Sequence, residues 1–228
     1  EEAANPVYLA DVGGIQVAFL GYTYGTNGIP LPKGKDYAVS LFNTDYLTHL
    51  STPDTDKLEA DLAAARALEP DLIAVMIHWG VEYQTKQNSY QETIADLLIS
   101  HGADLVLGGH SHVPQPMEER TVTGWDGAER TGFVCYSLGN FISSQVDPLT
   151  DTTAALTLEL TKDHGTGETT VTGWTYAPML MMRRDGTERV FTLTDTSVLP
   201  AGADQALVDR LEEAAETCRE IFGPESIS

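Results

Sequence analysis

Basic residues are scarce in this 228-residue chain, which has 13 lysines and arginines against 34 aspartates and glutamates and a formal net charge of −21. Binding to nucleic acid depends on clustered lysine and arginine side chains that displace the counterions of the phosphate backbone. We therefore predict no nucleic-acid partner. The acidic residues are spread along the chain rather than gathered into a tail, which is typical of a solvated surface.

Cysteines and long apolar runs are also scarce. The two cysteines, Cys135 and Cys218, show no metal-binding or redox spacing, and the sequence leaves a disulfide between them open. No run of 18 or more apolar residues exists, so we predict no membrane segment in this chain. With 42% hydrophobic residues and no repeat or linker, residues 1–228 are predicted to form a single domain.

A βαβ unit is predicted in the middle of the chain. Residues Asp71–Ile77 form a continuous apolar run typical of a strand buried on both faces. A helix follows from Ser89, with Ser89 and Glu92 as its capping box, and ends at Gly102. The run Asp104–Leu107 is the next buried strand. Two strands joined by a helix in this way are parallel, which predicts an α/β fold.

Turn residues and apolar patterns predict the remaining elements. A helix is expected from Thr52 to Pro70, with Pro53 at its first position, and another from Asp204 to Phe222. The loop Thr23–Lys35 either borders a site or is a plain surface connection. The further strands predicted are Val7–Val12, Ile15–Tyr22, Phe133–Leu138, Ala154–Leu160, Val171–Tyr176, Met179–Met182 and Val190–Leu193.

Histidines follow two of the predicted parallel strands. His78 comes directly after Ile77, and His110 and His112 follow Leu107 after two glycines. Ligands of open α/β sheets bind outside the carboxyl ends of the strands. Because residues two apart in an extended chain point to the same side, His110 and His112 are expected to face one point, with His78 converging from the adjoining strand. One such histidine is usually structural, but the three together predict a site for zinc, iron or manganese.

Three neighbouring residues have alternative interpretations. Glu82 is either a carboxylate that supports the site or carries protons, or an ordinary loop residue. The amide of Asn140 either reaches the same crevice or belongs to a Gly-Asn turn. Trp79 either lines a pocket or packs in the core. We predict Glu82 and Asn140 as catalytic residues and no organic cofactor, and we interpret His49, His101 and His164 as structural or surface residues.

These segments resemble the CapA family of capsule (poly-gamma-glutamate) synthesis proteins. The resemblance begins at the strand Gly14–Thr23 and continues through four motifs in the family's order. Position 111 is serine where the family commonly has proline, a small departure that should preserve the backbone path. The four motifs are His78-Trp79-Gly80-Val81-Glu82-Tyr83, Gly102-Ala103-Asp104, Gly108-Gly109-His110-Ser111-His112-Val113-Pro114-Gln115-Pro116 and Tyr136-Ser137-Leu138-Gly139-Asn140-Phe141.

The resemblance implies a fold and a chemistry. The family is similar to calcineurin-like metallophosphatases, so this chain is expected to be the C-terminal part of a metallophosphatase-like α/β sandwich, with mixed sheets covered by helices and without its amino-terminal part. By resemblance, His78, His110 and His112 are metal ligands. Divalent metal ions are expected, two of them in the full-length protein, where carboxylates would complete the site.

Two functions follow from the resemblance. One is metal-dependent hydrolysis, of a phosphoester or of an anionic polymer, in capsule biosynthesis. The alternative is a non-catalytic assembly or export component with a vestigial or incomplete metal site. Either role implies other capsule-synthesis proteins as partners. Either also implies a place at the bacterial cell surface, with membrane anchoring through a segment absent from this chain.

Overall fold

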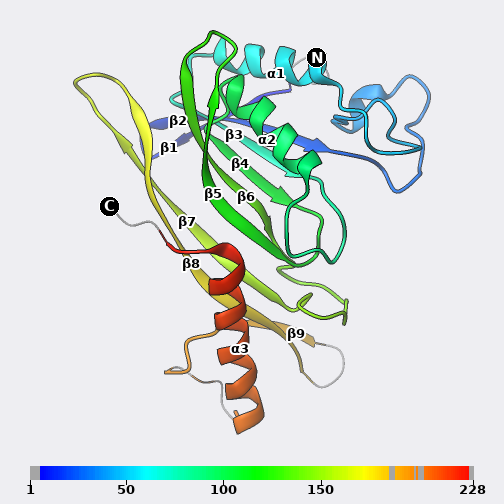
Figure 1. The fold of residues 1–228 in the computed structure, drawn as a ribbon, viewed down its shortest axis with the longest axis vertical. Coiled ribbons are helices and arrows are strands. Elements are labelled where there is room, and N and C mark those ends of the chain that lie inside the picture. Colours follow the sequence, from blue (N-terminus) through cyan, green and yellow to red (C-terminus); the bar gives the residue numbers. More distant parts are fainter. Residues whose placement is uncertain (1–5, 185–187, 198, 200–202, 226–228) are drawn as a thin grey trace.

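A six-stranded mixed sheet forms the centre of the computed structural model, which describes residues 6–184, 188–197, 199 and 203–225 (Figure 1). β2, β3, β4 and β6 are parallel, and the outer strands β1 and β5 are antiparallel to their neighbours. The predicted α/β class with a mixed sheet covered by helices is confirmed. The strands, in spatial order, are β1 (Tyr8–Val12), β2 (Ile15–Thr23), β3 (Leu72–His78), β4 (Leu105–Gly109), β6 (Glu129–Leu138) and β5 (Pro114–Thr123).

The predicted βαβ unit is confirmed as β3, α2 (Ser89–Ser100) and β4. Its capping box is one residue earlier than predicted. The side chain of Asn88 accepts from the backbone N–H of Gln91, and the Gln91 side chain accepts from the Asn88 backbone. Asn88 and Ser89 both have a suitable partner three residues on, so the spacing alone does not distinguish them. Asn88 has the extended backbone of an N-cap, whereas Ser89 is already helical.

Helix α1 (Thr55–Arg66) begins later than predicted. Pro53 is not its first residue, because it pairs with Asn43 in a short antiparallel bridge. The N-cap is Asp54, whose carboxylate accepts from the N–H of Lys57. A short 3₁₀ helix, η2 (Asp36–Ala38), lies in the preceding loop region.

The six-stranded sheet has an apolar layer on each face. Alternate residues such as Leu20 and Val75 pack under α1 and α2 on one face. Their strand neighbours, such as Val17 and Ala74, pack on the other face against the hairpin of β7 (Thr152–Lys162) and β8 (Thr169–Arg184). Cys135 and Cys218 are both buried free thiols. The core therefore lies on both sides of the sheet, as the continuous apolar runs predicted.

A second, antiparallel sheet is formed by β7, β8 and β9 (Glu188–Leu193). Residues Val171–Tyr176 and Met179–Met182, predicted as two strands, belong to the single strand β8. Pro178 is tolerated within it because the ladder with β9 begins only at Met179. Beside Pro178 the N–H of Thr194 donates to the Pro178 carbonyl, a bond that needs no N–H from proline.

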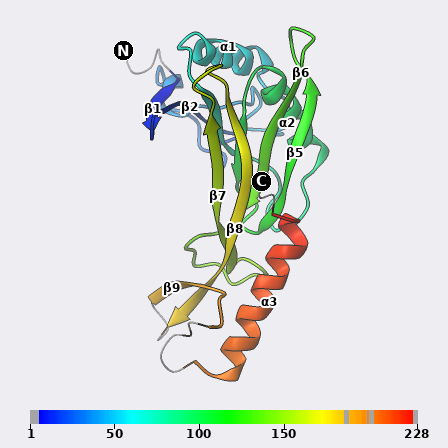
Figure 2. The same cartoon turned by 90° about the vertical axis from the view of Figure 1, so that its left-hand side faces the viewer.

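Helix α3 (Gln205–Phe222) confirms the predicted last helix. Its end carries Cys218 and Phe222 into the layer beneath the large sheet, while Leu211 and Ala214 pack with Leu180 of β8. Figures 1 and 2 show α3 and β9 extending beyond the six-stranded sheet. In the described part of the chain, no helix is both long and apolar enough to cross a bilayer. That residues 1–228 form one domain stays a prediction.

Candidate metal centre

The three predicted histidines lie together at the carboxyl edge of the parallel strands. His78 is the last residue of β3, and His110 and His112 follow β4. The ring centroids of His78 and His110 are 4.6 Å apart, and those of His110 and His112 are 6.0 Å apart. The order of the strands explains the convergence, because β3 and β4 are adjacent and parallel.

The backbone brings His110 and His112 together by a different route from the predicted one. It is not extended there, since φ is +109° at His110 and +63° at His112. Hydrogen bonds hold this turn from two sides. The N–H of Trp79 donates to Gly109 O over 3.0 Å, and that of Tyr83 donates to Ser111 O over 2.8 Å. Ser111 itself is fully buried, and its hydroxyl donates to the carbonyl of Val113.

Glu82 lies beside the histidines. Ligand atoms of Glu82, His110 and His112 are all within 4.8 Å of one another, a spacing that one metal ion can bridge. The carboxylate oxygen of Glu82 is 3.7 Å from Nε2 of His112. His78 adjoins this group through His110 but does not meet the same spacing. The donor set of imidazole nitrogens with one carboxylate fits a divalent zinc, iron or manganese ion.

The imidazoles of His78 and His110 favour the neutral form that binds metals. Burial, followed by the nearby His78 and His112, lowers the pKa of His110 to about 4. Burial and His112 also lower the pKa of His78. A neutral imidazole keeps a lone pair for a metal ion, and no proton needs to leave at neutral pH.

Tyr24 is a member of the site that the sequence did not identify. Its hydroxyl lies 2.9 Å from Nε2 of His110, and its ring stacks on that of His78 with centroids 5.8 Å apart. Burial, with a smaller effect of Glu82, raises the pKa of Tyr24, so the phenol stays protonated. The sequence signal that could have identified Tyr24 is its position directly after β2. Strand β2 is parallel to β3 and ends at the same edge of the sheet.

Asn140 and Tyr83 surround His112. Oδ1 of Asn140 lies 2.9 Å from Nδ1 of His112, and the Tyr83 ring stacks on the imidazole with centroids 5.9 Å apart. Asn140 therefore reaches the predicted crevice from the loop after β6. Trp79, by contrast, is fully buried and donates its indole N–H to the carbonyl of Tyr136. Of its two interpretations, core packing is correct.

A cavity of about 470 Å³ opens beside His110 and Glu82. Its walls carry aromatic and neutral polar groups, including Tyr24, Tyr90 and Asn88. Among the described residues that line it there is no lysine or arginine. His49, interpreted as structural or surface, also lines this cavity. A group bound here would meet hydrogen-bonding and aromatic surfaces, with the carboxylate of Glu82 among them.

Comparisons with known proteins place these features in a family. The family model of the bacterial capsule synthesis protein PGA_cap matches residues 1–145. The capsule biosynthesis protein CapA of Bacillus anthracis is 30% identical over 73% of this chain and 36% of its own length. The PGA biosynthesis protein CapA of Bacillus subtilis is 28% identical over 75% of this chain and 39% of its own length.

The chain therefore spans less than two fifths of either curated relative. Among solved structures, the NAD nucleotidase NadN of Haemophilus influenzae aligns with a TM-score of 0.43 at 13% identity. That alignment covers 98% of this chain and 39% of the nucleotidase.

Proposed function

Since this chain belongs to the family of the bacterial capsule synthesis protein PGA_cap, as the sequence resemblance predicted, we propose that it contributes a metal-dependent hydrolase site to capsule synthesis. His78, His110 and His112 would hold the metal, together with Glu82. The observation that supports this proposal most is the grouping of Glu82, His110 and His112, whose ligand atoms lie within 4.8 Å of one another.

The metal would supply Lewis acidity, which polarises the bond to be broken and makes water more acidic. Glu82, if it does not bind the metal, can accept a proton from the attacking water. Tyr24, held protonated beside His110, can donate a hydrogen bond to a bound substrate or to the imidazole. Asn140 would act by orienting His112 rather than by touching the substrate.

The substrate would be a phosphoester or an anionic polymer of the capsule. In a chain of net charge −21, such a substrate is repelled unless the metal receives its negative group. The cavity beside His110 would then hold a neutral part of the substrate. Consistent with family membership, we propose that the whole protein acts at the cell surface, anchored by a segment outside this chain, with other capsule-synthesis proteins as partners.

Metal binding and hydrolysis test the proposal. The double variant His110→Ala, His112→Ala should bind Zn²⁺ or Mn²⁺ at least about 100-fold more weakly than the wild type, because two ligands are lost. His164→Ala is the matched control, since His164 is exposed in the turn between β7 and β8. The proposal fails if the wild type binds neither metal, or if a longer form that includes this chain hydrolyses no phosphoester and no capsule polymer.

A non-catalytic assembly or export role is the second candidate. It is favoured by the presence of a single carboxylate, Glu82, in the group of possible ligands found among the described residues. Hydrolases with two metal ions use carboxylates to hold and bridge them. Capsule formation in cells that carry the His110→Ala, His112→Ala variant separates the two roles. An intact capsule would favour assembly, and a lost capsule with normal protein abundance would favour catalysis.

A further inference from the structure

His112 has its two ring nitrogens in different surroundings. Nδ1 faces Oδ1 of Asn140 at 2.9 Å, while Nε2 faces the Glu82 carboxylate at 3.7 Å. If Nδ1 carries the proton, Nε2 is free to bind a metal beside Glu82. If Nε2 carries the proton, that position is blocked. The tautomer of His112 therefore decides whether the grouping with Glu82 is ready for a metal ion.

The orientation of the Asn140 amide sets this tautomer. Its Nδ2 group lies 3.2 Å from the carbonyl oxygen of Thr150, which can only accept a hydrogen bond. The same Nδ2 group lies 2.8 Å from Oε1 of Gln145. With both acceptors on the nitrogen side, the amide oxygen must face His112, where it can only accept. Nδ1 of His112 is then the donor.

Gln145 closes a ring of contacts around His112. While its Oε1 accepts from Asn140, its Nε2 donates to the hydroxyl of Tyr83 over 3.0 Å. The Tyr83 ring in turn stacks on His112. Gln145 thus contacts both residues that fix the imidazole: Tyr83, which stacks on the ring, and Asn140, which faces Nδ1.

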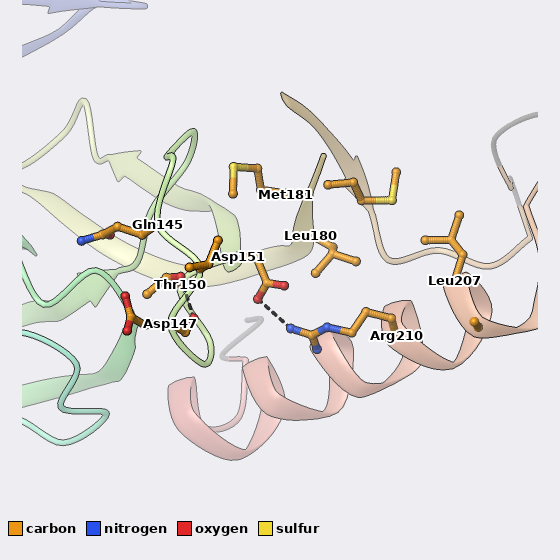
Figure 3. A pocket seen from close by; sticks show the side chains of 11 residues that line it. Gln145, Asp147, Thr150, Asp151, Leu180, Met181, Leu207 and Arg210 are labelled. Atoms are coloured by element: carbon orange, nitrogen blue, oxygen red, sulfur yellow. Dashed lines mark hydrogen bonds and ion pairs between the residues drawn. The ribbon is translucent and has the colours of Figure 1, made fainter. Parts of the chain in front are cut away.

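Gln145 also lines a second cavity, of about 490 Å³, formed by the loop after β6, strand β8 and α3 (Figure 3). In Figure 3 the amide end of Gln145 points away from Arg210. Asp151, at the end of the same loop, is bound to Arg210 at 2.6 Å. The loop is thereby tied to α3 while the Gln145 amide contacts Asn140 and Tyr83.

We propose that Gln145 is a positioning residue of the metal centre, which fixes the Nδ1–H tautomer of His112 by orienting the Asn140 amide and holding Tyr83 against the ring. The proposal deepens the proposed function, because it assumes that His112 is a metal ligand. It concerns the chain's own hydrogen bonds, so it can be tested in the metal-free protein.

The test is ¹⁵N NMR of the His112 ring in metal-free protein at neutral pH. The wild type should show a protonated Nδ1 and an unprotonated Nε2. Gln145→Met keeps a similar volume but removes the hydrogen bonds to Asn140 and Tyr83, which leaves only the 3.2 Å contact with the Thr150 carbonyl to orient the amide, and should give a mixture of the two tautomers. Its affinity for Zn²⁺, measured by competition with a chelator, should fall about 10-fold, the lower end of what loss of an outer hydrogen bond costs.

Two controls separate positioning from general loosening of the loop. Gln205→Met changes an exposed glutamine at the start of α3 and should leave the His112 spectrum unchanged. Arg210→Met removes the ion pair with Asp151 on the far wall of the second cavity and should also leave the tautomer unchanged. An equal change in Arg210→Met would overturn the proposal, because the effect would then belong to the loop as a whole.

Other outcomes are equally decisive. A wild-type His112 protonated at Nε2, or an unchanged tautomer in Gln145→Met, contradicts the positioning role. If Gln145→Met does not fold, Gln145→Glu is measured instead. The new carboxylate still accepts from Asn140, so the Nδ1–H tautomer of His112 should persist. Loss of that tautomer would refute the assignment. If the wild type binds no Zn²⁺, the proposed function fails while the NMR result still decides the role of Gln145.

Discussion

The indole nitrogen of Trp79 lies 3.0 Å from the carbonyl oxygen of Tyr136, and this hydrogen bond joins the end of β3 to β6 across the intervening strand β4. Both residues are fully buried, and their rings stack with centroids 5.8 Å apart. Gly108 of β4 lies directly at this contact. A Cβ atom there would overlap both the Tyr136 carbonyl and the Trp79 indole. The strand ends that carry the histidines can approach one another because residue 108 has no side chain.

Gly108→Ala should therefore destabilise the fold. The added methyl meets backbone on one side, which cannot move aside as a flexible side chain can, so the free energy of unfolding should fall by about 1–3 kcal/mol. Gly109→Ala is the matched control, because a Cβ at Gly109 has nothing within 4 Å. Urea denaturation of both variants measures the difference. Equal losses in the two would show that the contact at Gly108 is not the cause.

His110 should remain neutral far below the usual range for histidine. In metal-free protein, NMR titration of its ring should give a pKa of about 4, because burial and the neighbouring histidines disfavour the cation. The unfolded chain binds this proton near pH 6.5. Between pH 6.5 and about 4 the unfolded state thus binds more protons, so the contribution of His110 destabilises the fold as pH falls. A titration midpoint near 6.5 would contradict the prediction.

The contribution of Asp104 to stability should depend on pH in the opposite sense to that of His110. Burial raises its pKa to about 6, against the effects of its hydrogen bond from Ile73 and of Arg130. Because the folded state then holds a proton that the unfolded state has released, the contribution of Asp104 to stability is present below about pH 4 and is lost as pH rises through 6.

Asp104→Asn isolates this effect, since the amide oxygen can still accept from the N–H of Ile73. A pKa difference of one corresponds to about 1.4 kcal/mol. Relative to the wild type, the variant should therefore gain up to about 3 kcal/mol between pH 4 and pH 7. Urea denaturation at the two pH values measures the gain. A constant difference between variant and wild type would mean that Asp104 titrates as in the unfolded chain.

How far the sequence predicted this structure depended on whether a feature was local. The buried strands β3 and β4 and the helix between them were predictable, because continuous apolar runs and turn residues are local signals. His78, His110 and His112 were found for the same reason, since each follows such a run. Strand β5 was missed: its middle carries the charges of Glu118, Glu119 and Arg120, and its pairing with β6 supplies the stabilisation that its own sequence does not indicate.

Long-range contacts of the site could not be predicted in this way. Tyr24 meets His110 across 86 residues of sequence, and Gln145 meets Tyr83 across 62. Both lie in loops whose composition does not distinguish a site border from a surface connection. Their roles arise only when parallel strands bring loop ends to one edge. The positive φ angles of His110 and His112 were likewise unpredicted, because an alternating pattern assumes an extended chain.

The start of α2 provides a test between two caps that the sequence pattern alone does not separate. The Asn88 carboxamide accepts from the N–H of Gln91, whereas Ser89 is the first helical residue. Asn88→Ala should lower the free energy of unfolding by about 1 kcal/mol, because it leaves an N–H at the helix start without its acceptor. Asn88→Asp should retain most of the stability, since a carboxylate accepts the same bond and suits the positive end of the helix dipole.

Ser89→Ala is the control for this pair. In the structure Ser89 is exposed, so the change should stay within about 0.5 kcal/mol of the wild type and can even stabilise, because alanine is the better helix former. Denaturation of the three variants under one set of conditions measures the contrast. If Ser89→Ala were the costly change and Asn88→Ala the neutral one, the helix would begin one residue later than described. Asn88 would then no longer be fixed in the wall of the cavity beside His110.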